Sequence, residues 1–496
     1  MKKYCYCMTG NKVWLDSAID LYERGVAKPV LWLGDDCHYH KATKVFGGGV
    51  VVRMLDFVHY QQNIKNTNYN GENIEFFSSK HYLRAKDRCL KMMDRLDLYG
   101  TFGRIDREAI FNKLAIWILK RVEESQPDAL VVVENPHSHA QYLLYEICMY
   151  LDIEIVKFNT WMPVPLLFLQ YIKSGVRQKN KIKIDKSLSK RIEDDVLNYI
   201  DSIVNIKSRD NYELSYMKSQ RLQSKWVNSV ITFIKSGCMV LIKESWFQIR
   251  MSYKKDYYHI NPFRIGFFGR SKIKRLRKKN LLNEFKRKQE SVDLAKKYVY
   301  YALHFEPERT TNPDGGDFHD QVIAITRLRK QLPDDVDIFV KEHPSQFYMA
   351  DKGSRGRSPL FYDLIKNVNG VKLVSENINS LELVKHSIFV ATISGSVALE
   401  AAVMSKKALI FGDSWFNGCP NITSWTDNFS FENITKKRIS ETREIINFLL
   451  SEKELYAVPG CQNHSAQNRF SHYLDKTFVK SEFEGVTHLL EQFFTK

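Results

Sequence analysis

The chain has 496 residues, which is too long for one ordinary domain and indicates two or three. Hydrophobic residues make up 44% of it and aromatic residues 13%, so it can build cores and is not a wholly disordered protein. The formal net charge of +17 favours an anionic partner, such as nucleic acid, an anionic membrane face, a phosphorylated donor or an acidic glycan.

The eight cysteines are scattered and form no C-x-x-C pair, so we expect reduced thiols, as in a cytosolic protein. The N-terminal stretch MKKYCYCMTGNKVW lacks the apolar core of a signal peptide. The chain has no uninterrupted apolar run of about 18 residues, so we also expect no transmembrane helix.

The region 1–175 alternates strand and helix patterns. Strands are predicted within 3–10, 29–36, 128–137 and 153–159, and helices within 17–25, 112–128 and 139–152. Short apolar strands separated by helices of about 10–15 residues are typical of a parallel sheet covered on both faces. This region is therefore predicted to be a Rossmann-like domain.

The region 176–295 is rich in basic and aromatic residues, and strand patterns are scarce in it. The segment 270–288, RSKIKRLRKKNLLNEFKRK, holds ten basic residues and one acidic one, Glu284. Such a run forms either a solvated helix or linker, or a contact with an anionic membrane or acceptor. Upstream, residues 226–253 mix apolar and aromatic residues with lysines, as an interfacial helix or a core helix would.

The alternation returns in 296–425. Strands are predicted within 299–305, 336–344, 371–377, 387–394 and 407–414, and helices within 320–333, 359–368 and 397–405. This region is predicted to be a second Rossmann-like domain, and residues 426–496 a C-terminal helical segment. Ligands of such sheets bind beyond the carboxyl ends of the strands.

Each predicted strand of the second domain ends in polar residues, in the stretches LHFEPERTTNPDGG, KEHP, SENINS, TISGSVALEA and FGDSWF. A single His before a Pro is as often structural as functional, but five polar endings on one rim favour a binding cleft. Candidate ligand-binding residues on this rim are Glu306, Glu308, Arg309, Lys341, Glu342, His343, Pro344, Glu376, Ser394, Gly395, Ser396 and Glu400.

The strongest single element is the turn Ser394-Gly395-Ser396, which precedes a run of good helix formers. Unpaired backbone N–H groups at a helix start favour an anion, and glycine lets it approach closely. Ser396 is also a plausible plain helix cap. Glu400 lies one turn from Ser396 on the same face, where it can reach a ribose hydroxyl or orient a neighbouring side chain.

The order LHFEPE, PDGGDFHDQ, KEHP, SGS-x-ALEA and LIFGDSWF resembles the bacterial capsule polysaccharide biosynthesis family over residues 298–425. That family includes glycosyltransferases that use CMP-activated 3-deoxy-octulosonic acid (Kdo) and related nonulosonic acids. The HP and Ser-rich elements are also similar to those of bacterial sialyltransferases. The resemblance implies a GT-B fold, with two facing Rossmann-like domains, a cleft between them, and the donor nucleotide on the C-terminal one.

In that fold His343 would donate to the CMP phosphate, Pro344 would fix the turn, and Lys341 and Glu342 would flank the nucleotide. The single phosphate of CMP can be stabilised by a helix start and an imidazole, so no metal or other cofactor is expected. Asp35-Asp36 is the nearest approach to a metal-binding D-x-D motif.

Transfer also needs a carboxylate from the N-terminal domain, as a base or a nucleophile. Glu134 is the first candidate because it ends a buried strand, with His137 in support, although a capping or hinge role is nearly as plausible for it. Asp35 and Asp36 are the second choice.

The sequence therefore predicts a cytoplasmic glycosyltransferase that moves a nonulosonic or octulosonic acid from a CMP donor to a glycan or glycolipid acceptor. The basic run would allow peripheral contact with an anionic membrane. Alternatives are a UDP-sugar transferase or epimerase, or a non-catalytic protein of capsule assembly or export. A nucleic-acid partner is not expected, because no recognised binding motif accompanies the charge.

Overall fold

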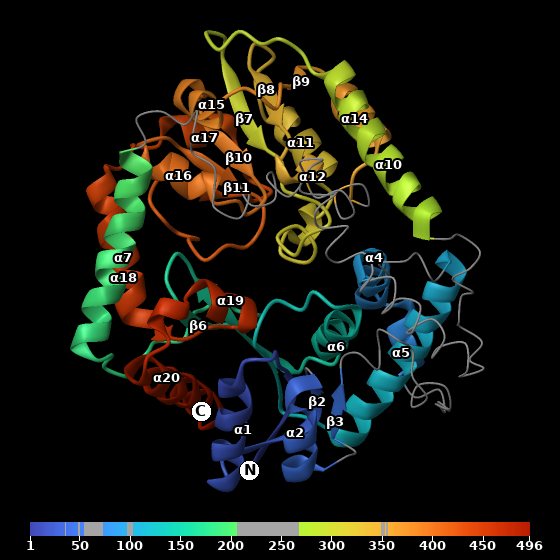
Figure 1. Ribbon diagram of the computed structural model, residues 1–496, viewed down its shortest axis with the longest axis vertical. Helices are drawn as coiled ribbons and strands as arrows, with labels where there is room; N and C mark the ends of the chain where they lie inside the picture. The colour runs from blue at the N-terminus through green and yellow to red at the C-terminus, as the bar shows by residue number, and fades with distance from the viewer. Residues whose placement is uncertain are drawn as a thin grey trace. The chain divides into compact units, whose positions relative to one another are not determined.

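The computed structural model describes residues 1–34, 36–47, 50–53, 73–96, 103–205, 267–348, 353 and 356–496. The chain divides into two compact units. The first unit contains residues 1–96, 104–202 and 443–496, and the second contains residues 97–103 and 203–442. Each has a central sheet with helices around it (Figure 1), which confirms the predicted α/β class with two Rossmann-like sheets.

The first unit has a seven-stranded sheet in the order β13-β6-β5-β4-β1-β2-β3. The strands are β1 (Lys2–Cys7), β2 (Ala27–Gly34), β3 (Val51–Arg53), β4 (Ala129–Val132), β5 (Glu154–Trp161), β6 (Leu166–Tyr171) and β13 (Val458–Pro459). Strands β3, β2, β1, β4 and β5 pair in parallel, whereas β6 pairs antiparallel with both β5 and β13. The parallel part has the 3-2-1-4-5 order of a Rossmann sheet.

The helices of the first unit follow the strands in the expected alternation. They are α1 (Lys12–Glu23), α2 (Tyr39–Phe46), α4 (Lys80–Leu96), α5 (Arg104–Ser125), α6 (His139–Tyr150), α7 (Lys186–Val204), α18 (Thr442–Tyr456), α19 (His464–Arg469) and α20 (Lys476–Phe494), with short 3₁₀ helices at Asp36–His38, Ile74–Ser78 and Ser471–Tyr473. Asn11 caps α1 by accepting from the Val13 amide, and Ser138 caps α6 by accepting from the Gln141 amide.

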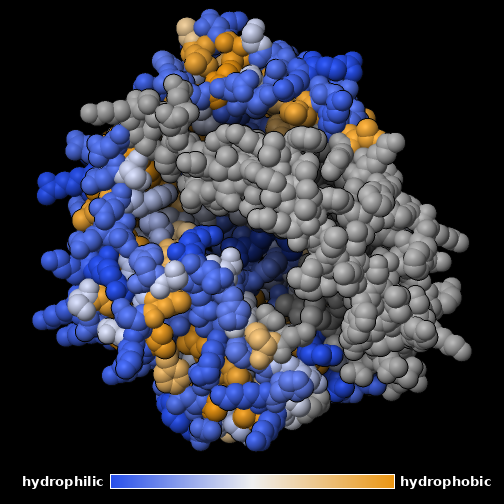
Figure 2. Space-filling model, in the orientation of Figure 1, coloured by the Kyte–Doolittle hydropathy of each residue, from blue (hydrophilic) through white to orange (hydrophobic). Residues whose placement is uncertain are grey.

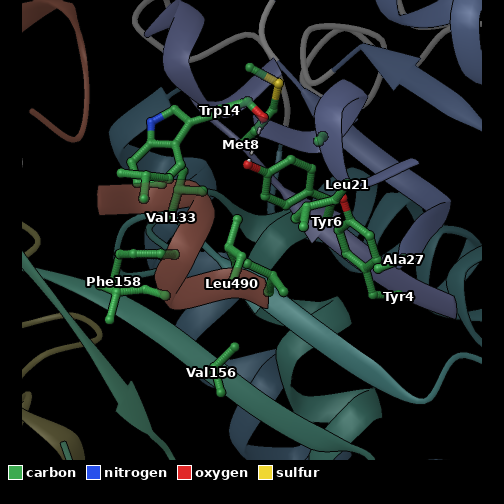
Figure 3. Close-up of a cluster of buried hydrophobic side chains, with 14 of the residues drawn as sticks. Tyr4, Tyr6, Met8, Trp14, Leu21, Ala27, Val133, Val156, Phe158 and Leu490 are labelled. Carbon is green, nitrogen blue, oxygen red and sulfur yellow. Dashed lines mark hydrogen bonds between the residues drawn. The ribbon is translucent and has the colours of Figure 1, made fainter. Parts of the chain in front are cut away.

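Successive residues of β1 point to opposite faces of the sheet, which explains why its buried part, Tyr4–Cys7, has no charged residue. Tyr4 and Tyr6 join the buried cluster formed with α1 and α20 (Figure 3), where the Tyr6 hydroxyl donates to the Trp14 carbonyl over 3.1 Å. Leu490 of α20 belongs to the same cluster. Burial of these aromatic and aliphatic side chains is the main force that holds α1 and α20 on the sheet.

The last part of the chain completes the first unit instead of forming a segment of its own. Strand β13 pairs with β6, and α20 packs on α1. The predicted boundary at residue 426 therefore differs from the structure, in which residues 443–496 belong with the N-terminal sheet.

The second unit has a fully parallel six-stranded sheet in the order β12-β11-β10-β7-β8-β9. The strands are β7 (Tyr298–Ala302), β8 (Asp337–Lys341), β9 (Val371–Leu373), β10 (Val390–Thr392), β11 (Ala408–Ile410) and β12 (Ile422–Ser424). Numbered from β7, this is the 3-2-1-4-5-6 order of a complete Rossmann sheet. The described helices are α10 (Phe267–Lys288), α11 (Gln321–Lys330), α12 (Ser345–Tyr348), α14 (Pro359–Lys366), α15 (Ser380–His386), α16 (Val397–Val403) and α17 (Phe431–Lys436), with a 3₁₀ helix at Gly316–Phe318.

The basic run 270–288 lies within α10. Its apolar edge is not all available to a membrane, because Leu281 and Phe285 are buried in the core of the second unit. Leu276 is exposed. A membrane role for this helix stays a prediction, and the proposed interfacial segment 226–253 lies outside the described residues.

On the face drawn in Figure 2, the described surface is mostly hydrophilic, with small apolar patches. No helix in the described ranges is both long and apolar enough to cross a bilayer. No disulfide links the described cysteines.

A buried carboxyl group, Glu482 of α20, makes the stability of the first unit depend on pH. Its Oε1 accepts from the Cys461 amide (2.8 Å) and from Asn11 Nδ2 (3.0 Å), yet burial raises the pKa of Glu482 from 4.5 to about 7. The folded state thus holds this proton more tightly than the unfolded state. The resulting stabilisation is full below pH 4.5 and is lost as pH rises through 7.

Glu482→Gln should therefore raise the free energy of unfolding at pH 8 by about 2–3 kcal/mol and change it little at pH 4. Glutamine keeps the Oε1 acceptor and carries no charge. Urea unfolding at both pH values measures the difference, with Glu484→Gln, an exposed glutamate of the same helix, as the matched control. An equal effect at both pH values would contradict the prediction.

Candidate functional site

The second unit has its topological switch point between β7 and β10, which are neighbours in the sheet. From there the chain builds the sheet outwards in both directions, so the loops that follow these two strands diverge and leave room for a ligand. These loops are residues 303–316 and 393–396, and they contain six of the twelve candidate residues on this rim.

His304, in the loop after β7, ties the two loops together. The Ser394 amide donates to its Nε2 over 3.1 Å, so the proton must sit on Nδ1, which donates to Thr310 Oγ1 over 3.1 Å. Burial, with the nearby His343 and Arg357, lowers the pKa of His304 to about 3, so the ring is neutral at physiological pH. His304 therefore fixes the start of the Ser394–Ser396 turn, a role the sequence analysis missed.

The buried pair Arg357 and Glu342 holds the end of β8. Arg357 Nε donates to Glu342 Oε2 over 3.0 Å, and both side chains are almost fully buried. The Tyr362 hydroxyl donates to the same oxygen (2.9 Å), and the His343 amide donates to Glu342 Oε1 (2.8 Å). The carboxylate of Glu342 thus faces inward and supports the backbone of His343, whereas the resemblance implied a place beside the nucleotide.

The Arg357 guanidinium also connects this pair to the loop after β7. Its Nη2 donates to the His304 carbonyl over 2.8 Å, and its Cζ atom lies 4.1 Å from the centre of the Phe361 ring. One side chain therefore joins the segment that carries His304 to the segment that carries His343. Sequence reasoning passed over Arg357 because it follows no strand end.

His343 presents a defined hydrogen-bond donor. The Ser345 amide donates to its Nδ1 over 3.2 Å, so the proton of the neutral ring lies on Nε2. Burial and the charge of Arg357 lower its pKa to about 4, so the ring is neutral at physiological pH. The side chain is partly exposed, and in the described residues no partner occupies Nε2. Pro344 follows at the turn into α12.

The turn Ser394–Ser396 is built to bring backbone close to the loop after β7. Ser394 Oγ donates to the Thr310 carbonyl (3.1 Å), and Ser396 Oγ donates to Glu400 Oε1 (3.2 Å). A Cβ atom on Gly395 would lie 2.9 Å from Thr392 Oγ1, so only glycine fits there without movement. In the described part of the chain the amides of Gly395 and Ser396 have no acceptor, and Ser396 makes no capping bond.

The remaining candidates of this rim have different surroundings. Lys341 donates to the Ile378 carbonyl and to Ser380 Oγ (3.1 Å), which ties β8 to the start of α15. Glu376 lies 3.6 Å from Lys286 of α10. Glu308 is exposed, and Arg309 lies 3.9 Å from Asp314.

Glu306 lies in the loop after β7, two residues after His304. Its Oε1 accepts from Gln321 Nε2 (3.1 Å), and burial raises the pKa of its carboxyl group. The backbone amide of Glu306 donates to Gln346 Oε1, and Gln346 Nε2 donates to the backbone carbonyl of Glu306, each over 2.9 Å. Gln321 and Gln346 were missed, although Gln346 lies only three residues after His343 and is buried.

The first unit carries a second polar cluster at its own switch point, after β1 and β4. Glu134 follows β4, and its Oε2 accepts from Asn463 Nδ2 over 2.6 Å. His137 Nδ1 lies 3.2 Å from Glu134 Oε1. The sequence analysis paired Glu134 with His137, and the structure brings them together. Asp35 lies outside the described residues, and for Asp36 the backbone alone is described, in a 3₁₀ helix.

Asn463 reaches this edge from the C-terminal segment. Residues 461–467 cross the ends of the strands, where Asn11 Nδ2 donates to the Cys461 carbonyl (2.6 Å) and Gln467 Nε2 donates to Asn11 Oδ1 (3.0 Å). Gln462 Nε2 donates to the Phe158 carbonyl over 2.7 Å. No local pattern in the sequence indicates that this segment returns to the first sheet.

Comparison with known proteins finds a family match for part of the chain. Residues 256–448 match the model of the family described as "Capsule polysaccharide biosynthesis protein". This confirms the resemblance predicted from the LHFEPE, KEHP and SGS motifs over that region. No curated protein matches the chain.

Two solved structures illustrate more distant likenesses. "Thermosulfurimonas dismutans KpsC, beta Kdo 2,7 transferase" is 11% identical and covers 77% of this chain and 90% of its own, at a TM-score of 0.27. The UDP-GlcNAc 2-epimerase from Methanocaldococcus jannaschii is 12% identical and covers 95% and 99%, at a TM-score of 0.23. TM-scores this low support no argument, so the fold is assigned from the strand order of the two sheets.

Arg357→Met should lower the free energy of unfolding of the second unit by about 3–5 kcal/mol, because it leaves the Glu342 charge buried and unpaired. Glu342→Gln in the same chain removes that charge and should recover part of the loss. Urea unfolding of the single and double variants measures the difference. A double variant no more stable than Arg357→Met would show that the pair is not the source of the effect.

Proposed function

We propose that this chain, whose second unit matches the capsule polysaccharide biosynthesis family, is a glycosyltransferase that takes an acid sugar from a CMP-activated donor. The observation that carries the proposal is that the matched region forms a complete Rossmann sheet with His343 and the Ser394–Ser396 turn at its ligand-binding edge. The sugar would be a nonulosonic or octulosonic acid, and the acceptor a glycan or glycolipid.

The donor groups suit the phosphate of a CMP-sugar. His343 offers an N–H donor from a neutral ring, and the amides of Gly395 and Ser396 offer two more. When the bond between sugar and phosphate breaks, negative charge grows on the phosphate oxygens. Fixed donors directed at that charge lower the barrier, and they need no reorganisation during the reaction.

The groups around these donors are suited to hold them still. His304 bonds the Ser394 amide, and Glu342 bonds the His343 amide, so both phosphate-binding segments are fixed by buried side chains. Lys341 and Glu342, which were expected to flank the nucleotide, serve as supports in this proposal. Glu306, Glu376 and Glu400 stay candidates for contacts with the ribose, the base or the sugar.

The proposal predicts selective stabilisation by CMP. In a thermal shift experiment, CMP at about 100 times its Kd should stabilise the protein by about 2.7 kcal/mol, which raises Tm by several degrees, while UDP and GDP have smaller effects. Preference for UDP would favour a UDP-sugar transferase or epimerase. No response to any of the three nucleotides would favour a non-catalytic role in capsule assembly.

The donor site can be tested at one residue. His343→Ala should reduce transfer from the CMP-sugar by about 10²–10³-fold, because a phosphate donor is lost, and should leave the protein folded. His386→Ala, which removes an exposed histidine of the same unit, is the matched control and should keep the parent rate. Transfer by His343→Ala at the parent rate would show that the donor phosphate binds elsewhere.

A further inference from the structure

The second unit carries a layer of three helices, α10, α14 and α11. Helix α14 is the middle one, because it contacts both of the others, and Figure 1 shows it beside α10. One side of each helix is buried in the same core, through Leu281 and Phe285 of α10, Tyr362 and Ile365 of α14, and Leu328 of α11. The opposite sides of the three helices together form an outer surface of the unit, which we call the α10–α14–α11 face.

Exposed apolar side chains lie on this face. Leu360 and Leu364 are one turn apart on α14, on the opposite side from the buried Tyr362, and are 71% and 55% exposed. Leu276 of α10 is 57% exposed, and Ile323 of α11 is 44% exposed. A single exposed leucine is ordinary, but a pair on one side of a helix, with a further apolar side chain on each adjoining helix, is typical of a surface that contacts an apolar partner.

The exposed charged side chains of the three helices are all basic. Among the side chains that the structure describes there, they are Arg277, Lys279, Lys286, Arg287, Arg327, Lys330 and Lys366. The two acidic residues of these helices are half-buried and paired, Glu284 with Arg287 over 2.7 Å and Asp363 with Lys288 over 2.8 Å. The face therefore combines a strong positive charge with exposed leucines.

Four of these basic side chains have no acidic partner. Within the part of the chain that the structure describes, no ion pair is made by Arg277, Lys279, Arg327 or Lys330. The other three each pair with a glutamate. The four unpaired charges come from both outer helices of the layer, so an anionic partner can reach them on either side of α14.

The combination of leucines and cations selects the partner. A soluble polyanion, such as nucleic acid or an acidic glycan, would pair with the basic side chains and leave the leucines in water. A bilayer with anionic lipids satisfies both groups. Its boundary between headgroups and acyl chains buries the leucines, and its headgroups take the charged ends of the Lys and Arg side chains.

We propose that the α10–α14–α11 face binds the surface of an anionic lipid bilayer, with Leu360 and Leu364 buried among the lipids. The sequence indicated only the basic run of α10. The structure adds α14 as the main apolar part of the contact, because Leu281 of α10 is buried in the core. The inference goes beyond the proposed transfer reaction and does not depend on it, since a non-catalytic assembly protein with this face would bind the same surface.

Sedimentation with vesicles tests the apolar part of the contact. The full chain should bind vesicles made of equal parts of phosphatidylglycerol and phosphatidylcholine. The double variant Leu360→Ser, Leu364→Ser should bind them at least about tenfold more weakly, since both side chains lose apolar area that the lipids would bury. The matched control is Leu455→Ser, Val479→Ser, which changes two exposed apolar residues of the first unit and should bind like the parent protein. All four side chains are exposed, so both variants should keep the circular dichroism spectrum of the parent.

The same assay tests the charged part of the contact. Lys279→Gln, Lys330→Gln should weaken binding at low salt by about fivefold for each residue, because each cation near an anionic bilayer contributes about that factor. The effect should shrink as salt is added, since salt screens the attraction. The control variant Lys436→Gln, Lys480→Gln changes exposed lysines of α17 and α20 and should bind like the parent protein.

A tryptophan on α14 distinguishes a membrane from a soluble anion. In Leu364→Trp, the emission of the introduced indole, taken as the difference from the parent protein, should shift to shorter wavelengths on the anionic vesicles. Lipids brominated on their acyl chains should quench it, because the indole would lie among the lipids. The Leu455→Trp control should show neither change.

Three results would overturn the membrane role of this face. They are parent-like vesicle binding by Leu360→Ser, Leu364→Ser, an absence of quenching in Leu364→Trp, and equal binding to vesicles of phosphatidylcholine alone. Binding to soluble polyphosphate but not to vesicles, weakened in Lys279→Gln, Lys330→Gln, would assign the face to a soluble polyanion instead. The CMP response is measured separately, so its failure would overturn the proposed function and leave vesicle binding unchanged.

Discussion

The strand order of the two sheets is the constraint on which both candidate sites depend. In each unit the chain starts in the middle of the sheet, builds towards one edge, and then returns to build towards the other. The loops after β7 and β10, and those after β1 and β4, therefore end side by side and leave in different directions. Backbone groups at these points have no strand partner, so side chains must bond them.

The second unit meets that need with buried polar side chains, and this fixes the charge state of the site. His304 accepts a hydrogen bond from the Ser394 amide at its unprotonated Nε2. A protonated ring would place an N–H group against that amide, so burial and hydrogen bonding both favour the neutral form. The positive charge of the cluster thus resides on Arg357, where Glu342 balances it, and His343 stays a neutral donor at physiological pH.

Much of the fold could be predicted because the central strands are apolar on both faces. Stretches such as YCYC in β1 and IFV in β8 have the composition of parallel strands, and the polar residues that follow the strands indicate a candidate ligand-binding edge. The roles within that edge could not be assigned in the same way. Glu342 and His343 are neighbours in sequence, yet one faces inward, because Arg357, fifteen residues later, pairs with it.

The short and antiparallel strands were missed for a related reason. β13 has only two residues, Val458 and Pro459, which is too few for any periodicity to show. Its place is set by pairing with β6 and by the packing of α20 on α1, which are contacts between distant parts of the chain. Patterns within a short window carry no information about such contacts, so the C-terminal boundary was placed too early.

The return of the C-terminal segment completes the polar cluster at the edge of the first sheet. Asn463 bonds Glu134 across 329 residues of sequence, and residues 461–467 also bond Asn11 and Phe158. The entropy of closing so long a loop is recovered only when α20 buries its apolar face on the first sheet. The edge that carries Glu134 and His137 is therefore complete only when the C-terminal segment has packed on the first sheet, because Asn463 of that segment bonds the Glu134 carboxylate.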